Sequence, residues 1–182
     1  DVDFAIVPTQ WQLKQFPKWM RPKLQVIHEG IDVEKLSNLS KISPNSSRFN
    51  LPKDPNIKVV TYVSRGFEEY RGFPQAMKAF SLLQQMRPDV HILLAGADIV
   101  AYGSPRKDSR TWRQWALDEV PLDPERTHWL GMLQDDAYHD LLCISHAQLY
   151  LTVPFVLSWS LLEAMAVGCS IVASSTAPVK EV

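Results

Sequence analysis

The chain has 182 residues, of which 46% are hydrophobic and 21% are charged, and this balance excludes a disordered tail or a fibrous repeat. The 19 basic and 20 acidic residues give a net charge of −1, which argues against nucleic-acid binding because such binding needs many phosphate contacts. A chain of this length forms one domain of ordinary size, or one domain together with a fragment of another.

The two cysteines, Cys143 and Cys169, lie in apolar segments (DLLCISH and AVGCSIV), so we predict buried free thiols and a reducing, cytoplasmic compartment. No apolar run approaches the ~20 residues of a membrane span. The first residues, DVDFAIVPTQ, lack the basic region of a signal peptide. The sequence does not begin with methionine, and APVKEV at its end is typical of a helix start, so we expect a piece of a longer protein.

Short apolar runs alternate with amphipathic stretches along the chain. Strands are predicted over residues 4–7, 24–27, 57–63, 90–95, 127–130, 149–153 and 171–173. Helices are predicted over residues 74–86, 109–120, 135–145 and 160–167. Residues 37–55 are rich in Ser, Asn, Pro and Lys, which predicts a linker or surface loop. In the first helix we expect Met77, Phe80, Leu83 and Met86 to share a buried face.

The alternation of strands and helices from residue 57 onward predicts an α/β fold, with a mostly parallel sheet and helices on both faces. In such sheets, ligands bind at the carboxyl ends of the strands, near the point where the strand order reverses. The loops that follow the strands are therefore the first places to look for functional side chains.

The loop after the strand at 57–63 contains two arginines, Arg65 and Arg71, in a turn with glycines. Glycine lets a backbone approach a ligand closely, and the guanidinium group grips phosphate oxygens. The pattern therefore favours a diphosphate site. The alternative is a solvated loop in which the two arginines pair with Glu68 and Glu69.

The segment YLTVPFVLSWSLLEAMAVG (150–168) contains the start of a helix near Trp159, which Ser158 or Ser160 is able to cap. The backbone N–H groups of Trp159, Ser160 and Leu161 would form an anion site there. Glu163 is surrounded by apolar residues and needs a partner, such as the hydroxyl groups of a ribose. The alternative is a glutamate that is favoured near a helix start by the helix dipole.

A third pattern is His139, Cys143 and His146, all predicted on one helix. Although these are metal-ligating residue types, no matching cluster accompanies them, so we predict an ordinary packed helix and no metal site.

Three ordered segments of the chain are SRGFEEYRGFPQAMKAF, VHILLAGAD and the stretch from WLGM to the end, in which EAMAVGCSIVAS followed by APVKEV is the most specific part. Together they resemble the C-terminal, donor-binding domain of glycosyltransferase family 4. The spacing Arg-x5-Arg-Gly matches the Arg-x5-Lys-Gly of that family. The likeness begins near Val26, where VIHEGID resembles the interdomain segment, and His28-Glu29-Gly30 resembles the hinge loop, although a surface turn with Gly30 at positive φ fits equally.

The resemblance implies the GT-B architecture of two Rossmann-like domains. We expect residues 1–25 to be a remnant of the acceptor-side domain or an interdomain segment. Residues 26–182 would form the Rossmann-like nucleotide-sugar-binding domain, truncated at its C-terminus. Without the missing N-terminal domain, we expect binding without turnover, because effective catalysis needs both reactants held in place.

The activity that the resemblance implies is a retaining transfer of a hexose from a nucleotide diphosphate sugar. UDP-glucose is the expected donor, and a polysaccharide or lipid-linked sugar is the expected acceptor, with peripheral membrane contact of the full-length protein on the cytoplasmic side. No cofactor is expected. The one Asp-x-Asp sequence, Asp1-Val2-Asp3, lies at the start of the chain and outside the segments that carry the resemblance, and we predict a metal-independent reaction.

The resemblance also implies roles for individual residues. Arg65 and Arg71 would hold the diphosphate and stabilise the departing charge, the backbone at Trp159 and Ser160 would hold the distal phosphate, and Glu163 would bind ribose. The remaining predicted donor contacts are Ser64, Gly66, Gly96, Gly131, Met132, Leu133, Ser158 and Leu161. Of these, the loop at Gly131 and Met132 would frame the base through its backbone.

Two positions depart from the pattern of the family. Phe155 stands where the first glutamate of the Glu-x7-Glu motif is expected, and Ser158 stands where many relatives have glycine. Phenylalanine is unable to hydrogen-bond a sugar hydroxyl, which leaves two alternatives open. One is a nucleotide-sugar-binding module that has lost transferase activity. The other is a GT-B sugar-phosphate enzyme such as an epimerase, for which the sequence offers no identifiable general acid or base.

Overall fold

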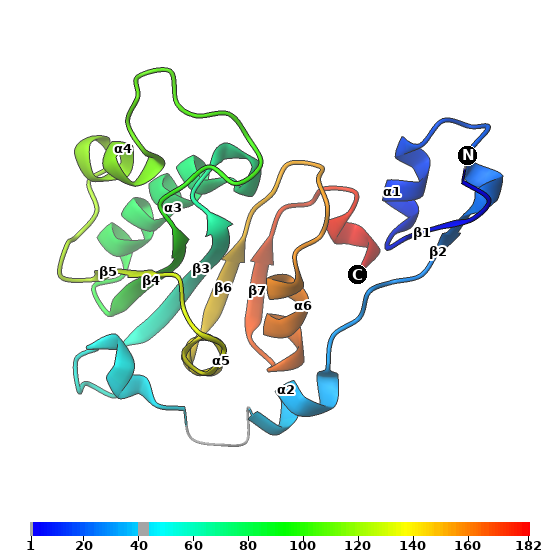
Figure 1. The fold of residues 1–182 in the computed structure, drawn as a ribbon. Helices are drawn as coiled ribbons and strands as arrows, with labels where there is room; N and C mark the ends of the chain where they lie inside the picture. Colours follow the sequence, from blue (N-terminus) through cyan, green and yellow to red (C-terminus); the bar gives the residue numbers. More distant parts are fainter. Residues whose placement is uncertain (1, 40–43) are drawn as a thin grey trace.

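The computed structural model describes residues 2–39 and 44–182 (Figure 1). The strands are β1 (Ala5–Val7), β2 (Leu24–Val26), β3 (Lys58–Gly66), β4 (Val90–Ala97), β5 (Thr127–Gly131), β6 (Ala147–Tyr150) and β7 (Ser170–Ala173). The α-helices are α1 (Gln10–Gln15), α2 (Val33–Leu39), α3 (Phe73–Met86), α4 (Trp112–Glu119), α5 (Asp135–Ile144) and α6 (Trp159–Ala166).

The main sheet has five parallel strands in the order β5-β4-β3-β6-β7. From β3 the chain runs outward to β4 and β5, and then crosses to the other side of β3 to form β6 and β7. The strand order therefore reverses between β3 and β6. In an open parallel sheet, this is the place where the loops at the carboxyl ends diverge and leave a crevice.

Helices cover both faces of this sheet, because successive residues of a strand point to opposite faces. On one face, side chains of α3 and α4 form an apolar core with Tyr62 of β3 and Leu94 of β4. On the other face, Leu141 of α5 packs with Val59 of β3 and Leu93 of β4. Helix α6 contacts β7 and α2. The prediction of a parallel α/β sheet with helices on both faces is therefore confirmed.

The N-terminal residues form a small parallel pair, β1 and β2, with α1 beside it (Figure 1). The hydroxyl of Thr9 caps α1 by accepting the backbone N–H of Gln12 at 3.1 Å. The carboxylate of Glu181 accepts the backbone N–H groups of Gln10 and Trp11 at the start of α1. The beginning and the end of the chain therefore lie against each other.

The strand ends that differ most from the prediction are those of β3 and β6, where the chain leaves the sheet near the crevice. β3 continues to Gly66 instead of ending at residue 63, and β6 covers Ala147–Tyr150 instead of 149–153. Beyond β6, the backbone N–H of Thr152 donates to the hydroxyl of Ser174 at 3.0 Å rather than to a strand. The apolar run therefore extends beyond the end of β6, because the Ser174 hydroxyl replaces a backbone carbonyl of a neighbouring strand as acceptor.

The prediction of a loop over 37–55 is wrong in part, and residues 40–43 of that stretch lie outside the described residues. Helix α2 extends to Leu39, and a 3₁₀ helix spans Ser46–Phe49. Phe49 is buried against the core on the α5 side of the sheet. Neither α1 nor α2 is predicted from the sequence, because each is short and Leu36 is the one buried residue that they contain.

The predicted buried face of α3 is correct for Met77 and Phe80 but wrong for Met86, which is 78% exposed. Met86 lies nine residues after Met77, and at about 100° per residue this distance ends half a turn away from the buried face. Residues that recur every three positions therefore move step by step away from one face of a helix.

Three further predictions concern cysteines, metal sites and membrane spans. Cys143 and Cys169 are free as predicted, but both are half-buried rather than buried. His146 lies beyond the end of α5, and the described part of the chain contains no group of side chains placed to hold a metal ion. Within the same residues, no helix has the length and apolarity required to cross a bilayer.

Candidate functional site

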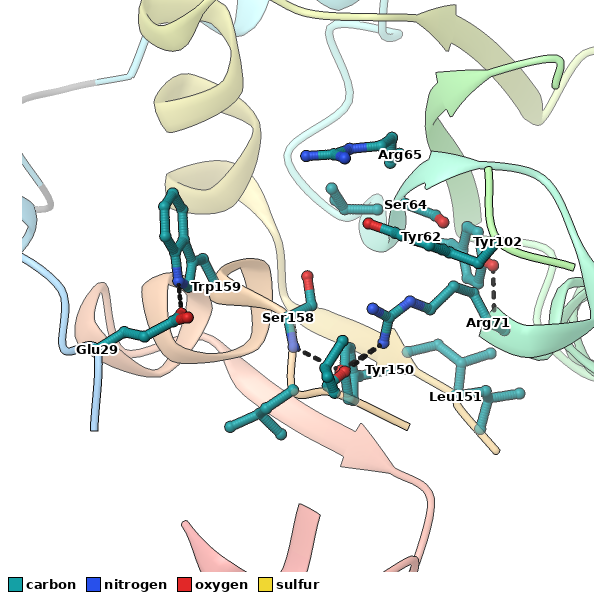
Figure 2. A pocket seen from close by; sticks show the side chains of 14 residues that line it. Glu29, Tyr62, Ser64, Arg65, Arg71, Tyr102, Tyr150, Leu151, Ser158 and Trp159 are labelled. Atoms are coloured by element: carbon teal, nitrogen blue, oxygen red, sulfur yellow. Dashed lines mark hydrogen bonds between the residues drawn. The ribbon is translucent and has the colours of Figure 1, made fainter. Parts of the chain in front are cut away.

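A cavity of about 280 Å³ lies at the crevice where the strand order reverses (Figure 2). It is lined by residues at the ends of β3 and β6 and in the loops after β3, β4 and β6, by the start of α6, and by Glu29 from the segment between β2 and α2. The lining residues are Glu29, Tyr62, Val63, Ser64, Arg65, Arg71, Tyr102, Leu149, Tyr150, Leu151, Val156, Leu157, Ser158 and Trp159. Five of the predicted site residues are among them: Ser64, Arg65, Arg71, Ser158 and Trp159.

Arg65 lies at the end of β3 and is exposed to solvent in the cavity. Its guanidinium carbon lies 5.9 Å from the centre of the Tyr102 ring, which is within the range of a cation–π contact. Within residues 2–39 and 44–182, no ion pair involves Arg65 or Arg71. The charge of Arg65 is therefore available to an anionic ligand.

Arg71 is buried, with 7% of its surface exposed. Its Nη1 donates to the hydroxyl of Tyr150 at 3.1 Å, to the hydroxyl of Thr152 at 3.3 Å and to the carbonyl of Val156 at 3.1 Å. The guanidinium carbon lies 5.2 Å from the centre of the Phe155 ring. The second arginine is thus part of the wall of the cavity and holds the loop after β6.

Tyr150 connects this arginine to the start of α6. Its hydroxyl accepts from Arg71 and also accepts the backbone N–H of Ser158 at 3.0 Å (Figure 2). Tyr150 is buried, so these bonds are not in competition with bulk water. The arginine, the tyrosine and the first turn of α6 therefore form one connected unit.

The first turn of α6 presents two backbone N–H groups that lack an acceptor within the helix. Ser158 occupies the N-cap position, but its hydroxyl bonds to the hydroxyl of Ser160 at 2.8 Å instead of capping the backbone. The N–H of Leu161 donates to the carbonyl of Ser158 at 3.2 Å, so this predicted anion contact is already engaged. The N–H groups of Trp159 and Ser160 remain at positions where an α-helix offers no internal acceptor.

The alternative interpretation of this loop, in which Arg65 and Arg71 pair with Glu68 and Glu69, is wrong, because no ion pair among the described residues joins them. Glu68 bonds to another loop instead. Its carboxylate is fully buried, and Oε2 accepts the backbone N–H groups of Tyr102 at 3.0 Å and Gly103 at 2.7 Å. Glu68 thereby fixes the loop after β4, so that the ring of Tyr102 lies beside the guanidinium groups of Arg65 and Arg71.

Glu163 faces a neighbouring cavity of about 220 Å³. That cavity is lined by Gly30, Ile31, Asp32, Lys35, Leu36, His139, Trp159 and Glu163. The partner of the carboxylate is Tyr138, whose hydroxyl donates to Oε2 at 2.6 Å. Burial and the adjacent carboxylate raise the pKa of Tyr138, so its hydroxyl keeps the proton that it donates.

The remaining predicted contacts lie outside the main cavity. Gly66 and Gly96 sit where strands and loops approach closely, and a Cβ atom on Gly96 would lie 2.4 Å from the carbonyl oxygen of Ser64. Gly131 has a φ of +66° with open space beside it, Met132 is exposed, and Leu133 packs against the core on the α5 side. Ser160 and Leu161 are buried in α6.

The structure adds residues to the site that the sequence analysis does not assign to it, above all Glu29, Tyr102 and Tyr150. Tyr150 is the last residue of β6, and Tyr102 lies in the loop after β4. Their positions at the carboxyl ends of strands are the signal that would have found them. Glu29 comes from outside the sheet, and the sequence analysis names it only within the segment that resembles the hinge loop.

The comparisons with known proteins agree with this architecture. The sequence profile described as Glycosyl transferases group 1 matches residues 44–182, and the profile described as Glycosyl transferase family 4 group matches residues 1–36. No curated protein matches the chain in sequence.

Several solved structures share the fold. A sucrose-phosphate synthase from Thermosynechococcus elongatus is 19% identical, with a TM-score of 0.68, over 97% of this chain and 41% of that one. A UDP-forming α,α-trehalose-phosphate synthase from Burkholderia vietnamiensis is 13% identical, with a TM-score of 0.71, over 98% of this chain and 46% of that one. A TarM variant from S. aureus, in complex with UDP among other ligands, is 16% identical, with a TM-score of 0.63, over 97% and 30%.

The chain spans less than half the length of each of these three structures, and identities this low establish the fold alone. The profile match, in contrast, covers most of the sequence and ends at its last residue. The family that the motifs around Arg65 and Glu163 indicate is therefore confirmed. This chain belongs to the glycosyl transferases group 1 family.

Proposed function

We propose that this chain is the donor-binding part of a retaining glycosyltransferase and that its main cavity holds the diphosphate of a nucleotide sugar. One observation supports this most strongly: Arg65, Arg71 and the start of α6, with Ser158 and Trp159, line a single cavity at the crevice of the sheet. Guanidinium groups and a helix start are the groups that bind phosphate oxygens well.

The same groups suit the chemistry of sugar transfer. When the bond between the anomeric carbon and the diphosphate breaks, negative charge grows on the departing diphosphate. Cations and N–H dipoles that are already in place stabilise this charge without reorganisation. We therefore propose that the reaction needs no divalent ion. Arg65 contacts the departing diphosphate directly, while Arg71 stabilises its charge electrostatically from within the wall of the cavity.

UDP-glucose is the donor that we propose. Matched structures include trehalose-phosphate synthases named as UDP-forming, and one from E. coli named as bound with UDP-2-fluoro glucose. We propose a polysaccharide or lipid-linked sugar as acceptor, bound by a separate domain to which residues 1–25 belong or lead. Peripheral membrane contact of the full-length protein at the cytoplasmic side belongs to the same proposal.

The test is calorimetry of UDP binding to the 182-residue chain and to Arg65→Ala. Loss of a hydrogen bond to a charged group should weaken binding by roughly 1.5–3 kcal/mol, about 10- to 150-fold. Arg87→Ala is a matched control, because it removes an exposed arginine before β4, at the opposite end of the sheet. Unchanged affinity of Arg65→Ala would refute the site, and affinity that requires Mg²⁺ would refute metal independence.

A second candidate function is a nucleotide-sugar-binding module without transferase activity. The observation that favours it is Phe155, whose ring packs on the guanidinium of Arg71 where the resemblance leads one to expect a carboxylate. Sugar transfer or UDP-glucose hydrolysis by the full-length protein separates the two functions. A module of this kind would bind UDP with Arg65-dependent affinity and show neither reaction.

A further inference from the structure

Trp159 holds a distinctive place in the molecule, because it borders three cavities. Among the described residues it alone lines the cavity of Arg65 and Arg71, the cavity of Glu163 and a third cavity beside His28. It is 59% exposed, although its backbone N–H belongs to the ordered start of α6. One residue thus combines an amide that is suited to an anion with an exposed aromatic ring.

The indole ring is held at one edge. Its Nε1 donates to the carboxylate of Glu29, which reaches α6 from the segment between β2 and α2 (Figure 2). Because this hydrogen bond engages only the edge of the ring, a face of the exposed indole remains available to a ligand. A ring that is held in advance loses less conformational freedom when a ligand packs on it.

The position of Trp159 relative to Glu163 indicates which part of a nucleotide would lie on the indole ring. The two residues are four apart in α6, so their side chains share one face of the helix, about 6 Å apart along its axis. If the diphosphate lies at the start of α6 and the ribose lies at Glu163, the nucleoside runs along this face. The indole then borders this path at its diphosphate end, since it lines the same cavity as Glu163.

We propose that the indole of Trp159 packs against the nucleoside half of the bound nucleotide, and that Glu29 positions the ring. This inference rests on the proposed function, because it assumes a nucleoside diphosphate in the main cavity. It adds to that function an aromatic contact, supplied by the side chain at the helix start, that distinguishes a nucleotide from a simple diphosphate.

The experiment compares UDP with inorganic pyrophosphate on the 182-residue chain and on Trp159→Leu and Trp159→Phe. Stacking of a base on an aromatic ring predicts that Trp159→Leu loses about tenfold in UDP affinity or more. Its affinity for pyrophosphate should stay within twofold, because the backbone N–H is retained. Trp159→Phe keeps a ring and should lose less. Trp19→Leu, which changes another highly exposed tryptophan, should alter neither affinity.

Tryptophan fluorescence gives a second readout. UDP should quench the emission of the unmodified chain and of Trp19→Leu, and this quenching should be lost in Trp159→Leu. Retained pyrophosphate binding shows that the variant is folded. Wild-type UDP affinity in Trp159→Leu, or equal losses for UDP and pyrophosphate, would overturn the inference alone. Failure of the unmodified chain to bind UDP would refute the proposed function, and this inference with it.

Discussion

Arg65 and Arg71 differ in their surroundings far more than their six-residue spacing suggests. Arg65 is exposed and lies beside the ring of Tyr102, whereas Arg71 is buried and donates to two hydroxyl groups and a carbonyl. An exposed arginine contributes to ligand binding, while a buried one also holds the protein together. The two positions should therefore respond differently to the same substitution.

We predict that Arg71→Ala lowers the free energy of unfolding by roughly 1–3 kcal/mol, because it leaves buried acceptors without their donor. Arg65→Ala should change that free energy by no more than about 0.5 kcal/mol, as exposed substitutions usually do. Urea denaturation of both variants measures this difference. Arg71→Lys should fall between them, since it keeps the charge but not the planar fork. Equal stability of the two alanine variants would contradict the account of Arg71.

Residue types and spacing single out two arginines that line the main cavity and Glu163, which lines a neighbouring cavity, but they do not describe the surroundings of these residues. The partners of Arg71 lie about 80 residues further along the chain, at Tyr150 and Val156. The partner of Glu163 is Tyr138, on a different helix. Such contacts depend on how β3, α5 and α6 come together, which local sequence patterns do not describe.

At the scale of elements, strands and helices that carry a strong apolar pattern were predicted well, and short elements were not. Hydrophobic patterns locate β4 and α3 because these elements are largely buried. Helix α1 has no buried residue, and the end of β6 depends on a bond to Ser174. The site is built at such element ends, so it is less predictable than the core.

The neighbouring strands β4 and β5 carry a pair of histidines, His91 and His128. Their nitrogens Nδ1 and Nε2 are 3.0 Å apart, and the rings stack at 5.3 Å. Burial lowers the pKa of both, the positive charge of Arg126 lowers that of His91 further, and Asp123 acts in the opposite direction. Both rings are thus neutral in the folded protein near pH 7.

This pair predicts how stability depends on pH. A histidine with a lowered pKa binds fewer protons when folded than when unfolded, so stability falls as pH drops below the ordinary value of about 6.5. We predict that the unmodified chain loses stability between pH 7.5 and 5.0 and that His128→Gln loses less. Urea denaturation at several pH values measures both slopes. A parallel pH dependence in the two proteins would contradict this reading of the pair.

At the scale of the whole molecule, the strand order β5-β4-β3-β6-β7 brings distant loops to one place. The loops after β3, β4 and β6 meet at the crevice, and Glu29 reaches the same cavity from the N-terminal part of the chain. Alternation of strands and helices predicted the crevice. It did not predict the contribution of Glu29, because that residue lies outside every repeated unit of the sheet.

The most direct test of the donor site is a crystal structure of the 182-residue chain with UDP. We predict the diphosphate within hydrogen-bonding distance of the Arg65 guanidinium and of the backbone N–H groups of Trp159 and Ser160, with the ribose toward Glu163. Electron density for UDP elsewhere on the molecule, or within the crevice but with its phosphates turned away from Arg65 and α6, would contradict the account.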